Sequence, residues 1–492
     1  MDTPKLDPVV RKSVESGLIT QGAVSENRRP ESSVSESINF DFDSIGSAVL
    51  RKGTTTLGSA LPAQINGLYH YIDTVNSTPR STLLAIAGTA AYYLNGTTFT
   101  SIRTGLTTGS KARFTTFLDQ VFMVNGTEAT TVWDGNTAGG FVTTGNAASA
   151  PIGKYIENFR SRIWIAGNPS KPDRVYYTSI PSSVATPVVT WNTSDTTGQW
   201  IDISPSDGDV ITALRRSRNN MLVFKQNRLY RVYSIAQTDP DPFYAVGTYS
   251  SESVVDTKAG IFFHHSSGFY QYNIYGVLQE ISRPIIDIVR AVTVANYANV
   301  VGWLEPDGDH ICWEVGDVTY RGVTYPKLVV RYTISTQVWT HRSYPVTFTN
   351  SAIYRDSSTV YALTGDSLGN VYQMNTGTTD NGTPIQYSLI HRWDNVDGLL
   401  STRKTVMECM FTHEGGAGAA VAYQVNGDNE NDWTKNLGDL NTDNTGFNSA
   451  NIKGRKLRMR IFGNSSGQQF TYNGYELVNV IAEFLQFETD NT

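Results

Sequence analysis

The chain has 492 residues, a formal net charge of −6 and only 17% charged residues. Its lack of a basic block argues against a protein that coats DNA, because such a protein needs cationic side chains to neutralise phosphates. No apolar run approaches the roughly 18 residues of a membrane span, and no charged-then-apolar leader opens the chain. We therefore expect a soluble protein made in a cytoplasm, with one large domain and a smaller second one.

The N-terminal region divides into two parts. Residues 1–34 are mostly polar and contain Pro4, Pro8 and Pro30, which predicts an extended N-terminal arm. Residues 35–60 show short apolar–polar alternation, which predicts one or two strands that pair with distant parts of the fold.

Residues 61–380 contain a β-unit that recurs seven times, each with an apolar strand, a short polar turn and a second strand. The apolar strands are anchored by Leu84, Val121, Ile163, Leu222, Ile261, Ile311 and Val360. A spacing of roughly 40 to 50 residues, with about four strands per unit, indicates a β-propeller. Closed propellers seal the ring by pairing a strand from one chain end with the blade at the other end. Thr54 to Leu57 is our candidate for that strand.

Two segments interrupt the repeat. Pro181 to Asp209 is a long polar insertion that contains Trp191 and Trp200, and we expect it to be a contact surface. Residues 285–292 carry apolar side chains at helical spacing, which predicts a short helix after the fifth unit.

Residues 381–492 have longer segments with period-two alternation, which predict an antiparallel β-sandwich. The predicted strands are residues 385–390, 405–412, 419–425, 455–462 and 478–487. The acidic, Asn-rich stretch from Gly427 to Asn451 is interpreted as a loop. The predicted fold class is therefore all-β: an irregular propeller of about seven blades plus a C-terminal antiparallel sandwich that the strands of residues 35–60 complete.

The sequence contains no constellation for catalysis, cofactor binding or metal binding. Cys312 and Cys409 are not part of a Cys-x-x-Cys pair, so we expect two buried free thiols rather than a zinc site or a disulfide. His413 lacks a second His four residues on. The adjacent His264 and His265 point to opposite faces of a predicted strand, so we expect packed or hydrogen-bonded rings rather than metal ligands.

A glycoside hydrolase is a minor alternative. Its acid and base would come from carboxylates near the blade mouths, namely Asp173, Asp207, Asp209, Glu305 and Asp309. The sequence places no two of them at a productive separation. The turn from Asp366 to Asn370 is only partly similar to the Asp-box of sialidase propellers, since it lacks the Ser-x-Asp start and the Thr-Trp end.

Two basic clusters are candidate subunit contacts: Arg215, Arg216 and Arg218 before the apolar strand of the fourth unit, and Lys456, Arg458 and Arg460 on one face of a predicted strand. The simplest interpretation is a solvated outer face. The functional interpretation is a contact with an acidic segment of a neighbouring subunit, such as its residues 427–443. Contact with DNA ranks third.

Several segments together match the pattern of a known family: Phe159 to Gly167 followed by Asp173 to Tyr177, Phe224-Lys225 followed by Leu229-Tyr230, Ala259 to Phe263 followed by Gly268 to Tyr270, the helical segment, and the pair Lys456 to Arg460 and Val480 to Phe487. Over roughly residues 35–490, the chain resembles the β-propeller tail-hub or nozzle proteins of short-tailed bacteriophages. None of these segments is a catalytic fingerprint.

The resemblance implies a structural virion protein that forms a ring, with six copies, below the portal or adaptor proteins. Such a ring extends the DNA channel, retains the genome and lets it pass at ejection. The implied partners are further copies of the chain, portal and adaptor proteins, tail fibres or spikes, and genomic DNA that passes without sequence recognition. The expected location is the phage tail, after synthesis in the host cytoplasm, with no enzymatic activity and no cofactor.

The main alternative is a tail propeller that binds a glycan or receptor. Trp191, Trp200 and Trp433 lie in polar segments and would serve this function, because aromatic faces stack on sugars.

Overall fold

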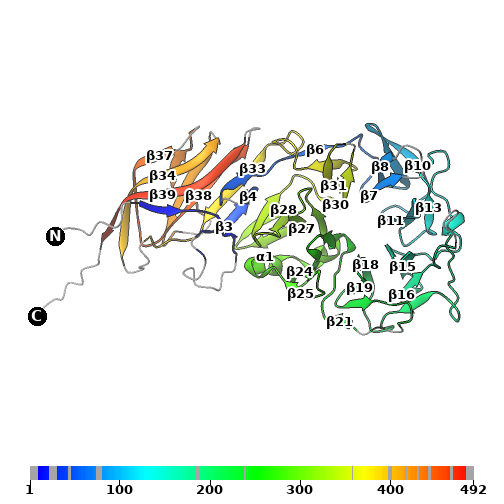
Figure 1. The fold of residues 1–492 in the computed structure, drawn as a ribbon. Coiled ribbons are helices and arrows are strands. Elements are labelled where there is room, and N and C mark those ends of the chain that lie inside the picture. The colour runs from blue at the N-terminus through cyan, green and yellow to red at the C-terminus, as the bar shows by residue number, and fades with distance from the viewer. Residues whose placement is uncertain are drawn as a thin grey trace, which may run out of the picture.

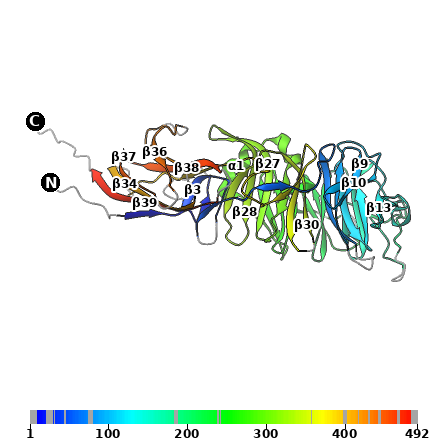
Figure 2. The same ribbon diagram turned by 90° about the horizontal axis from the view of Figure 1, so that it is seen from above.

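Six small antiparallel sheets and four strands of a larger sheet follow one another around an axis and form the seven blades of a propeller (Figure 1). The computed structural model describes residues 9–20, 30, 32–42, 46–73, 80–182, 188–237, 240, 242–356, 358–396, 402–415, 418–428, 432–441, 445–465 and 469–483. A β-sandwich lies beside the propeller, so that the molecule is elongated (Figure 2). The predicted all-β fold class is confirmed.

The blades are built from consecutive strands. Blade 1 contains β7 (Ile65–Asp73), β8 (Arg80–Ala87), β9 (Ala90–Asn95) and β10 (Thr98–Arg103). Blade 2 contains β11 (Arg113–Phe117), β12 (Gln120–Val124) and β13 (Thr131–Trp133), with the 3-10 helix η2 (Gly145–Ala147) after them. Blade 3 contains β14 (Tyr155–Phe159), β15 (Arg162–Asn168), β16 (Lys171–Tyr177) and β17 (Trp200–Asp202). Blade 4 contains β18 (Ile211–Ser217), β19 (Asn220–Lys225), β20 (Leu229–Val232) and β21 (Pro242–Tyr244).

The remaining blades follow the same plan. Blade 5 contains β22 (Val255–Thr257), β23 (Gly260–His265), β24 (Gly268–Asn273) and β25 (Leu278–Glu280), with the 3-10 helix η3 (Ser251–Ser253) before them. Blade 6 contains β26 (Val301–Leu304), β27 (His310–Tyr320), β28 (Val323–Thr333) and β29 (Trp339–Ser343), and blade 7 contains β30 (Phe348–Arg355), β31 (Val360–Asp366), β32 (Val371–Met374) and β6 (Thr54–Thr56). Between blades 5 and 6 lie η4 (Arg283–Ile285), α1 (Ile286–Ala291) and η5 (Val294–Asn299), so the predicted helix is confirmed.

The second strand of a blade is buried on both faces because it packs against two neighbouring blades. In β15, Ile163 packs in a cluster with Phe122 of blade 2. The next residue, Trp164, faces the other side and packs in a cluster with Met221 of blade 4. A strand that is covered on both faces needs a continuous apolar run rather than alternation. This requirement explains the apolar run that marks each unit in the sequence.

The ring is closed by a strand from the N-terminal region. Strand β6 pairs antiparallel with β32, with Thr55 opposite Gln373. The backbone N–H of Leu57 then donates to the carbonyl of Val371 at 2.7 Å. The predicted sealing strand at residues 54–57 is therefore confirmed.

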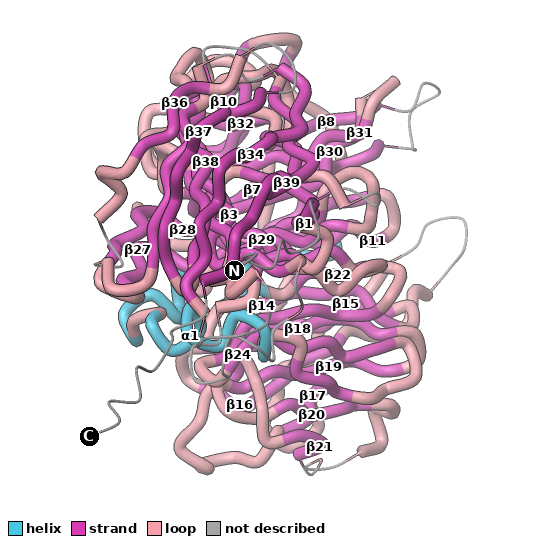
Figure 3. Tube along the Cα trace, turned by 90° about the vertical axis from the view of Figure 1, so that its left-hand side faces the viewer, coloured by secondary structure: helices cyan, strands magenta, loops and turns pink. Residues whose placement is uncertain are grey.

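The sandwich consists of two sheets (Figure 3). Its apolar core includes Leu389, Phe411 and Ile461. One sheet contains β37 (Thr445–Gly454), β34 (Arg403–Gly415), β39 (Phe470–Glu483), β5 (Ala48–Leu50) and β4 (Phe40–Phe42), with β1 (Val9–Lys12) on β39. The other contains β3 (Ser33–Ile38), β33 (Ile385–His391), β38 (Leu457–Ser465), β35 (Ala420–Val425) and β36 (Asn436–Asp439), with β2 (Gly17–Leu18) on β3. N-terminal strands thus complete both sheets, as predicted.

The second sheet of the sandwich is continuous with blade 6, which the sequence analysis did not anticipate. Strand β3 lies parallel to β29, with Ile38 opposite His341, and a single 10-stranded sheet results. The N–H of Asn39 donates to the carbonyl of His341 at 3.0 Å at this point. Backbone hydrogen bonds therefore cross from the propeller into the sandwich.

The structure also corrects three expectations for the chain ends. The expected loop between Gly427 and Asn451 contains β36 and most of β37, because edge strands with few apolar residues resemble loops in composition. The last strand, β39, begins at Phe470 rather than at residue 478, and residues 484–487 of the prediction lie outside the described residues. Part of the expected arm pairs as β1 and β2, whereas residues 1–8 and 21–29 lie outside the described residues.

Candidate binding groove and charged clusters

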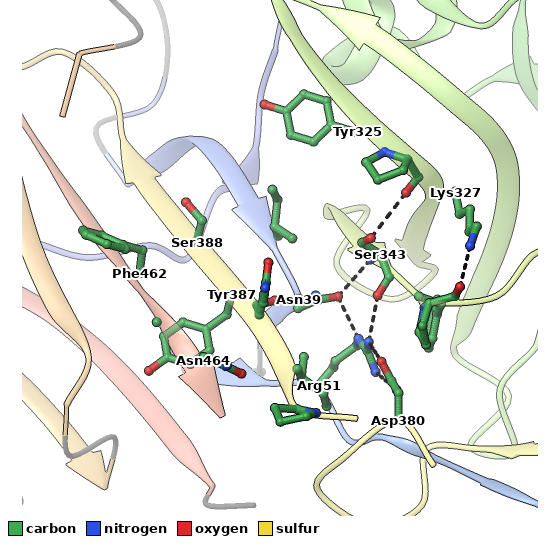
Figure 4. Close-up of a pocket in the computed structure, with 18 of the residues that line it drawn as sticks. Asn39, Arg51, Tyr325, Lys327, Ser343, Asp380, Tyr387, Ser388, Phe462 and Asn464 are labelled. Carbon is green, nitrogen blue, oxygen red and sulfur yellow. Dashed lines mark hydrogen bonds and ion pairs between the residues drawn. The ribbon is translucent and has the colours of Figure 1, made fainter. Parts of the chain in front are cut away.

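A groove of about 750 Å³ lies where the propeller meets the sandwich (Figure 4). Residues 323–327 on β28 of blade 6 line one side, and residues of β3, β33 and β38 line the other. The groove therefore spans the part of the 10-stranded sheet that joins the two halves of the molecule.

Arg51 occupies one end of this groove, between Asn39, Ser343 and Asp380 (Figure 4). Its Nη1 and Nη2 donate to the two carboxylate oxygens of Asp380 at 2.8 and 2.5 Å. Its Nε donates to Oδ1 of Asn39 at 2.7 Å, and Nη2 also donates to the carbonyl of Ser343 at 2.8 Å. Because these bonds use most of the guanidinium donors, Arg51 acts as a structural clamp rather than as a ligand-binding group.

Glu36 is a buried carboxylate in the same groove. The hydroxyl groups of Tyr325 and Ser388 donate to its two oxygens, each at 2.6 Å. Burial, together with the nearby Glu36 charge, raises the pKa of Tyr325 far above its usual value, so this hydroxyl stays protonated and donates. The groove floor is thus a satisfied hydrogen-bond network.

Arg460, from the second basic cluster, lines the groove and Arg458 lies beside it, whereas their neighbours Leu457 and Met459 lie in the sandwich core. Both arginines line an adjoining pocket of about 210 Å³. Lys456 directly precedes β38. A solvated outer face is the wrong interpretation for Arg458, because this residue is only 6% exposed.

Aromatic rings cover both guanidinium groups. Arg458 lies 4.6 Å from the ring centroid of Trp393 and 5.1 Å from that of Trp433. Arg460 lies 5.6 Å from the centroid of Trp433 and 4.7 Å from that of Phe462. These are cation–π distances, so the cluster contributes to packing within the subunit.

The structure divides the first basic cluster. Arg215 and Arg216 lie at the end of β18 and line a cavity on the propeller axis. Arg218 lies in the turn after this strand and is exposed. The three residues therefore do not form one surface.

The three tryptophans predicted for loop contacts have different environments. Trp191 is 8% exposed, packs between blades 2 and 3, and donates from Nε1 to the carbonyl of Asn146 at 3.1 Å. Its ring is thus unavailable to a sugar, because the insertion folds back onto the blades. Trp200 and Trp433 are half-buried, and the guanidinium of Arg174 covers Trp200 at 3.7 Å.

The carboxylates considered for acid–base catalysis already have partners. Asp173 and Asp207 accept from Nζ of the buried Lys225 at 2.9 and 2.7 Å. Asp209 accepts from the backbone N–H groups of Gln226 and Asn227, and Asp309 accepts from Ser335. These contacts are ion pairs or hydrogen bonds that hold turns in place, so the four carboxylates have structural roles.

Glu305 belongs to a buried ion-pair network that the sequence analysis missed. Arg342 donates to Glu305 at 2.7 Å and to Asp41 at 2.6 Å. Burial alone would raise the pKa of Glu305, but Arg342 and Arg331 lower it to about 2. The signal in the sequence was a charged residue inside an apolar strand, such as Arg331 in Leu328-Val329-Val330-Arg331.

Glu305, Asp307 and His310 have ligand-type atoms within 4.8 Å of one another. Asp307 accepts from Nδ1 of His310 at 2.6 Å, and Glu305 is engaged by two arginines. A cation there would lie beside two guanidinium groups, so we interpret this group as part of the ion-pair network.

The adjacent histidines His264 and His265 and the two cysteines are buried. His264 is 1% exposed and packs against Phe269, while His265 contacts the hydroxyl of Ser267 at 2.7 Å. Burial, with a smaller effect from His265, lowers the pKa of His264 to about 3. Cys312 and Cys409 are free and buried, as predicted.

These features define a propeller and a sandwich fused into one scaffold, with charged groups that hold its parts together. No protein-family model matches the chain. No curated protein matches it either. In the part of the chain that the structure describes, no helix is both long and apolar enough to span a membrane.

Solved structures show distant likeness. The computationally designed Ika8 protein aligns over 66% of this chain and 100% of its own, with 12% identity and a TM-score of 0.37. The extracellular domain of a putative hybrid two-component system from B. thetaiotaomicron aligns over 69% of this chain and 45% of its own, with 11% identity and a TM-score of 0.43. YCF48 bound to D1 peptide aligns over 69% of this chain and 98% of its own, with 11% identity and a TM-score of 0.40. Likeness at this level of identity concerns the fold alone.

Proposed function

We propose that the chain is a structural subunit of a bacteriophage tail, a hub or nozzle protein that forms a ring below the portal or adaptor. The resemblance of its strand segments to this family supports the proposal, together with the pairing of a propeller and a sandwich in one scaffold. In this function the chain performs no catalysis.

The 10-stranded sheet is the observation that carries the proposal. A ring subunit needs two different interfaces held at a fixed angle, because the rotation between copies must close the ring. Hydrogen bonds that run from β29 into β3 fix this angle, since a rotation of the sandwich against the propeller would break them. Arg51 and Asp380 reinforce the same junction.

The DNA conduit of such a ring lies between subunits rather than along the propeller axis. The axial cavity has a volume of only about 520 Å³ and is lined by charged side chains. A cavity of this volume has the size of a small-molecule pocket rather than that of a channel for a duplex. Six copies of a chain with a net charge of −6 would carry −36, which would keep phosphates from adhering to the lumen.

Arg460 and Lys456 are the members of the second basic cluster that best fit a subunit contact, since Arg458 is buried. Their proposed partner is the acidic segment of residues 427–443 in the next copy, where Asp432 and Asp439 are exposed. Portal or adaptor proteins above the ring and tail fibres at its outer side complete the proposed set of partners.

Negative-stain electron microscopy and mass photometry of the full chain test the proposal. The chain is examined alone and with the portal and adaptor proteins encoded by the same genome. We expect closed rings of six copies with a central channel. Arg460→Glu should weaken ring formation, whereas Arg218→Glu, which reverses the same charge on an exposed turn, should not.

The proposal would be overturned if the chain stays monomeric and does not bind the portal and adaptor proteins. In that case a glycan array, with Trp200→Ala and Trp433→Ala variants, would test the alternative of a glycan-binding propeller. Hydrolysis of a fluorogenic glycoside would support the hydrolase alternative instead.

A further inference from the structure

The cavity on the propeller axis is a second feature that the proposed function does not explain. The first strands of six blades and η3 of blade 5 line it, and its volume is about 520 Å³. Pockets for small molecules have volumes of about 300–1,000 Å³. The cavity is therefore large enough for a small ligand.

Cations outnumber anions in this cavity. Four arginines line it, namely Arg113, Arg215, Arg216 and Arg355, against the two carboxylates Glu157 and Glu252. This excess of positive charge occurs in a chain whose net charge is −6. The lining of the cavity is thus positively charged, whereas the chain as a whole is negatively charged.

Glu252 is already paired. Its carboxylate contacts Arg113 at 2.7 Å and Lys111 at 3.4 Å. Burial would raise the pKa of Glu252, but these two cations lower it to about 2. The charge of Arg113 is therefore largely compensated within the protein.

Arg215 and Arg216 act on Glu157 and Asp256 only through space, since neither forms an ion pair among the described residues. Nη1 of Arg216 donates to Oδ1 of Asn158 at 2.8 Å, and Nη1 of Arg215 donates to its neighbour's carbonyl, that of Leu214, at 3.1 Å. Among the described residues, no carboxylate oxygen lies within the 4.0 Å of an ion pair from either guanidinium. Both groups retain donors that face the cavity.

Glu157 lies on the neighbouring strand β14 and also lines the cavity. Burial raises the pKa of Glu157, while Arg215 and Arg216 lower it from a distance. The two guanidinium groups thus act on this carboxylate without an ion pair among the described residues, and all three side chains line the cavity.

We propose that this cavity binds a small molecule with phosphate or carboxylate groups, held by Arg215 and Arg216. The planar guanidinium binds both anions through paired hydrogen bonds, and two adjacent arginines favour a multiply charged ligand. The inference is independent of the proposed role in a phage tail.

Isothermal titration calorimetry on the full chain at low ionic strength tests the site, with inorganic phosphate and citrate as separate probes. We expect binding of at least one probe, and the stronger of the two identifies the anion class. Arg216→Ala should weaken binding at least tenfold. Arg218→Ala removes the same charge two residues away, outside the cavity, and should leave binding unchanged. Glu157→Gln should strengthen binding, because it removes a carboxylate from the cavity wall.

Arg216→Gln is a second variant that keeps a donor for Asn158, in case the alanine variant fails to fold, and it too should bind at least tenfold more weakly. The proposal is overturned if neither probe binds at millimolar concentration, or if Arg216→Ala and Arg218→Ala have equal effects. It is also overturned if Glu157→Gln weakens binding, since loss of a carboxylate cannot weaken the binding of an anion that is held by the charge of the arginines.

Discussion

Arg51 and Asp380, which are 329 residues apart in the sequence, form a bidentate ion pair at the junction of the propeller and the sandwich. Arg51 lies just before the sealing strand β6, and Asp380 follows the last blade. The pair therefore joins the two chain segments that close the propeller.

Arg51→Ala should lower the free energy of unfolding by about 3–5 kcal/mol, because it leaves the buried carboxylate of Asp380 without its partner. The side chains of the pair are 0% and 4% exposed. Urea unfolding followed by circular dichroism measures the change. Arg283→Ala is the matched control, since Arg283 pairs with Glu280 while 84% exposed, and it should change nothing measurable. Equal effects of the two substitutions would contradict the prediction.

Gly53→Ala should disturb the closure of the ring. A Cβ atom at Gly53 would lie 1.9 Å from the carbonyl oxygen of Thr379, a backbone atom that cannot move aside by rotation. We expect a loss of about 1–3 kcal/mol, as for other overpacked sites. Differential scanning fluorimetry measures the lowered midpoint. At Gly139, the nearest atom to an added Cβ is 3.8 Å away, so Gly139→Ala should leave the midpoint unchanged.

The blades could be predicted from the sequence because their second strands are covered on both sides. Leu83 and Leu84 pack into different clusters, so neither position tolerates a polar residue, and the apolar run is visible without any alignment. The sealing strand could be predicted for a topological reason, since a closed ring needs a strand from the other chain end.

The environments of single side chains could not be predicted. Trp191 follows a polar stretch, yet it is buried because the insertion folds back onto blades 2 and 3. Arg458 alternates with apolar neighbours, as a surface residue would, yet Trp393 and Trp433 enclose it. The continuity of blade 6 with the sandwich depends on one parallel pairing, between β29 and β3, and no local pattern indicates it.

Neither cysteine should react in the folded protein. Both thiols are buried, and burial raises the pKa of Cys409 to about 12 and that of Cys312 well above its usual value. A thiol must be exposed and deprotonated to react. Titration with Ellman's reagent should therefore detect no thiol under native conditions and both thiols in guanidinium chloride. Rapid native reaction of either one would show that its blade or sheet opens locally.

Glu314 should make the stability of the protein fall as the pH rises from about 5 to 8. Its carboxyl lies on β27, accepts from the backbone N–H of Phe348 at 2.7 Å, and has a pKa that burial raises to about 8. The unfolded chain, with the ordinary value of 4.5, releases this proton at a lower pH than the folded protein does. In this window the folded state binds more protons, so each pH unit costs up to about 1.4 kcal/mol of stability.

Glu314→Gln isolates this effect, because its amide oxygen still accepts from Phe348 but the side chain does not titrate. Urea unfolding of both proteins at pH 4, 6 and 8 gives the difference in unfolding free energy, in which the contributions of other groups cancel. The glutamine variant should gain stability relative to the native protein from pH 4 to pH 8. A difference that stays constant over this range would show that the carboxyl is ionised in the folded protein, with water reaching it from the edge of blade 6.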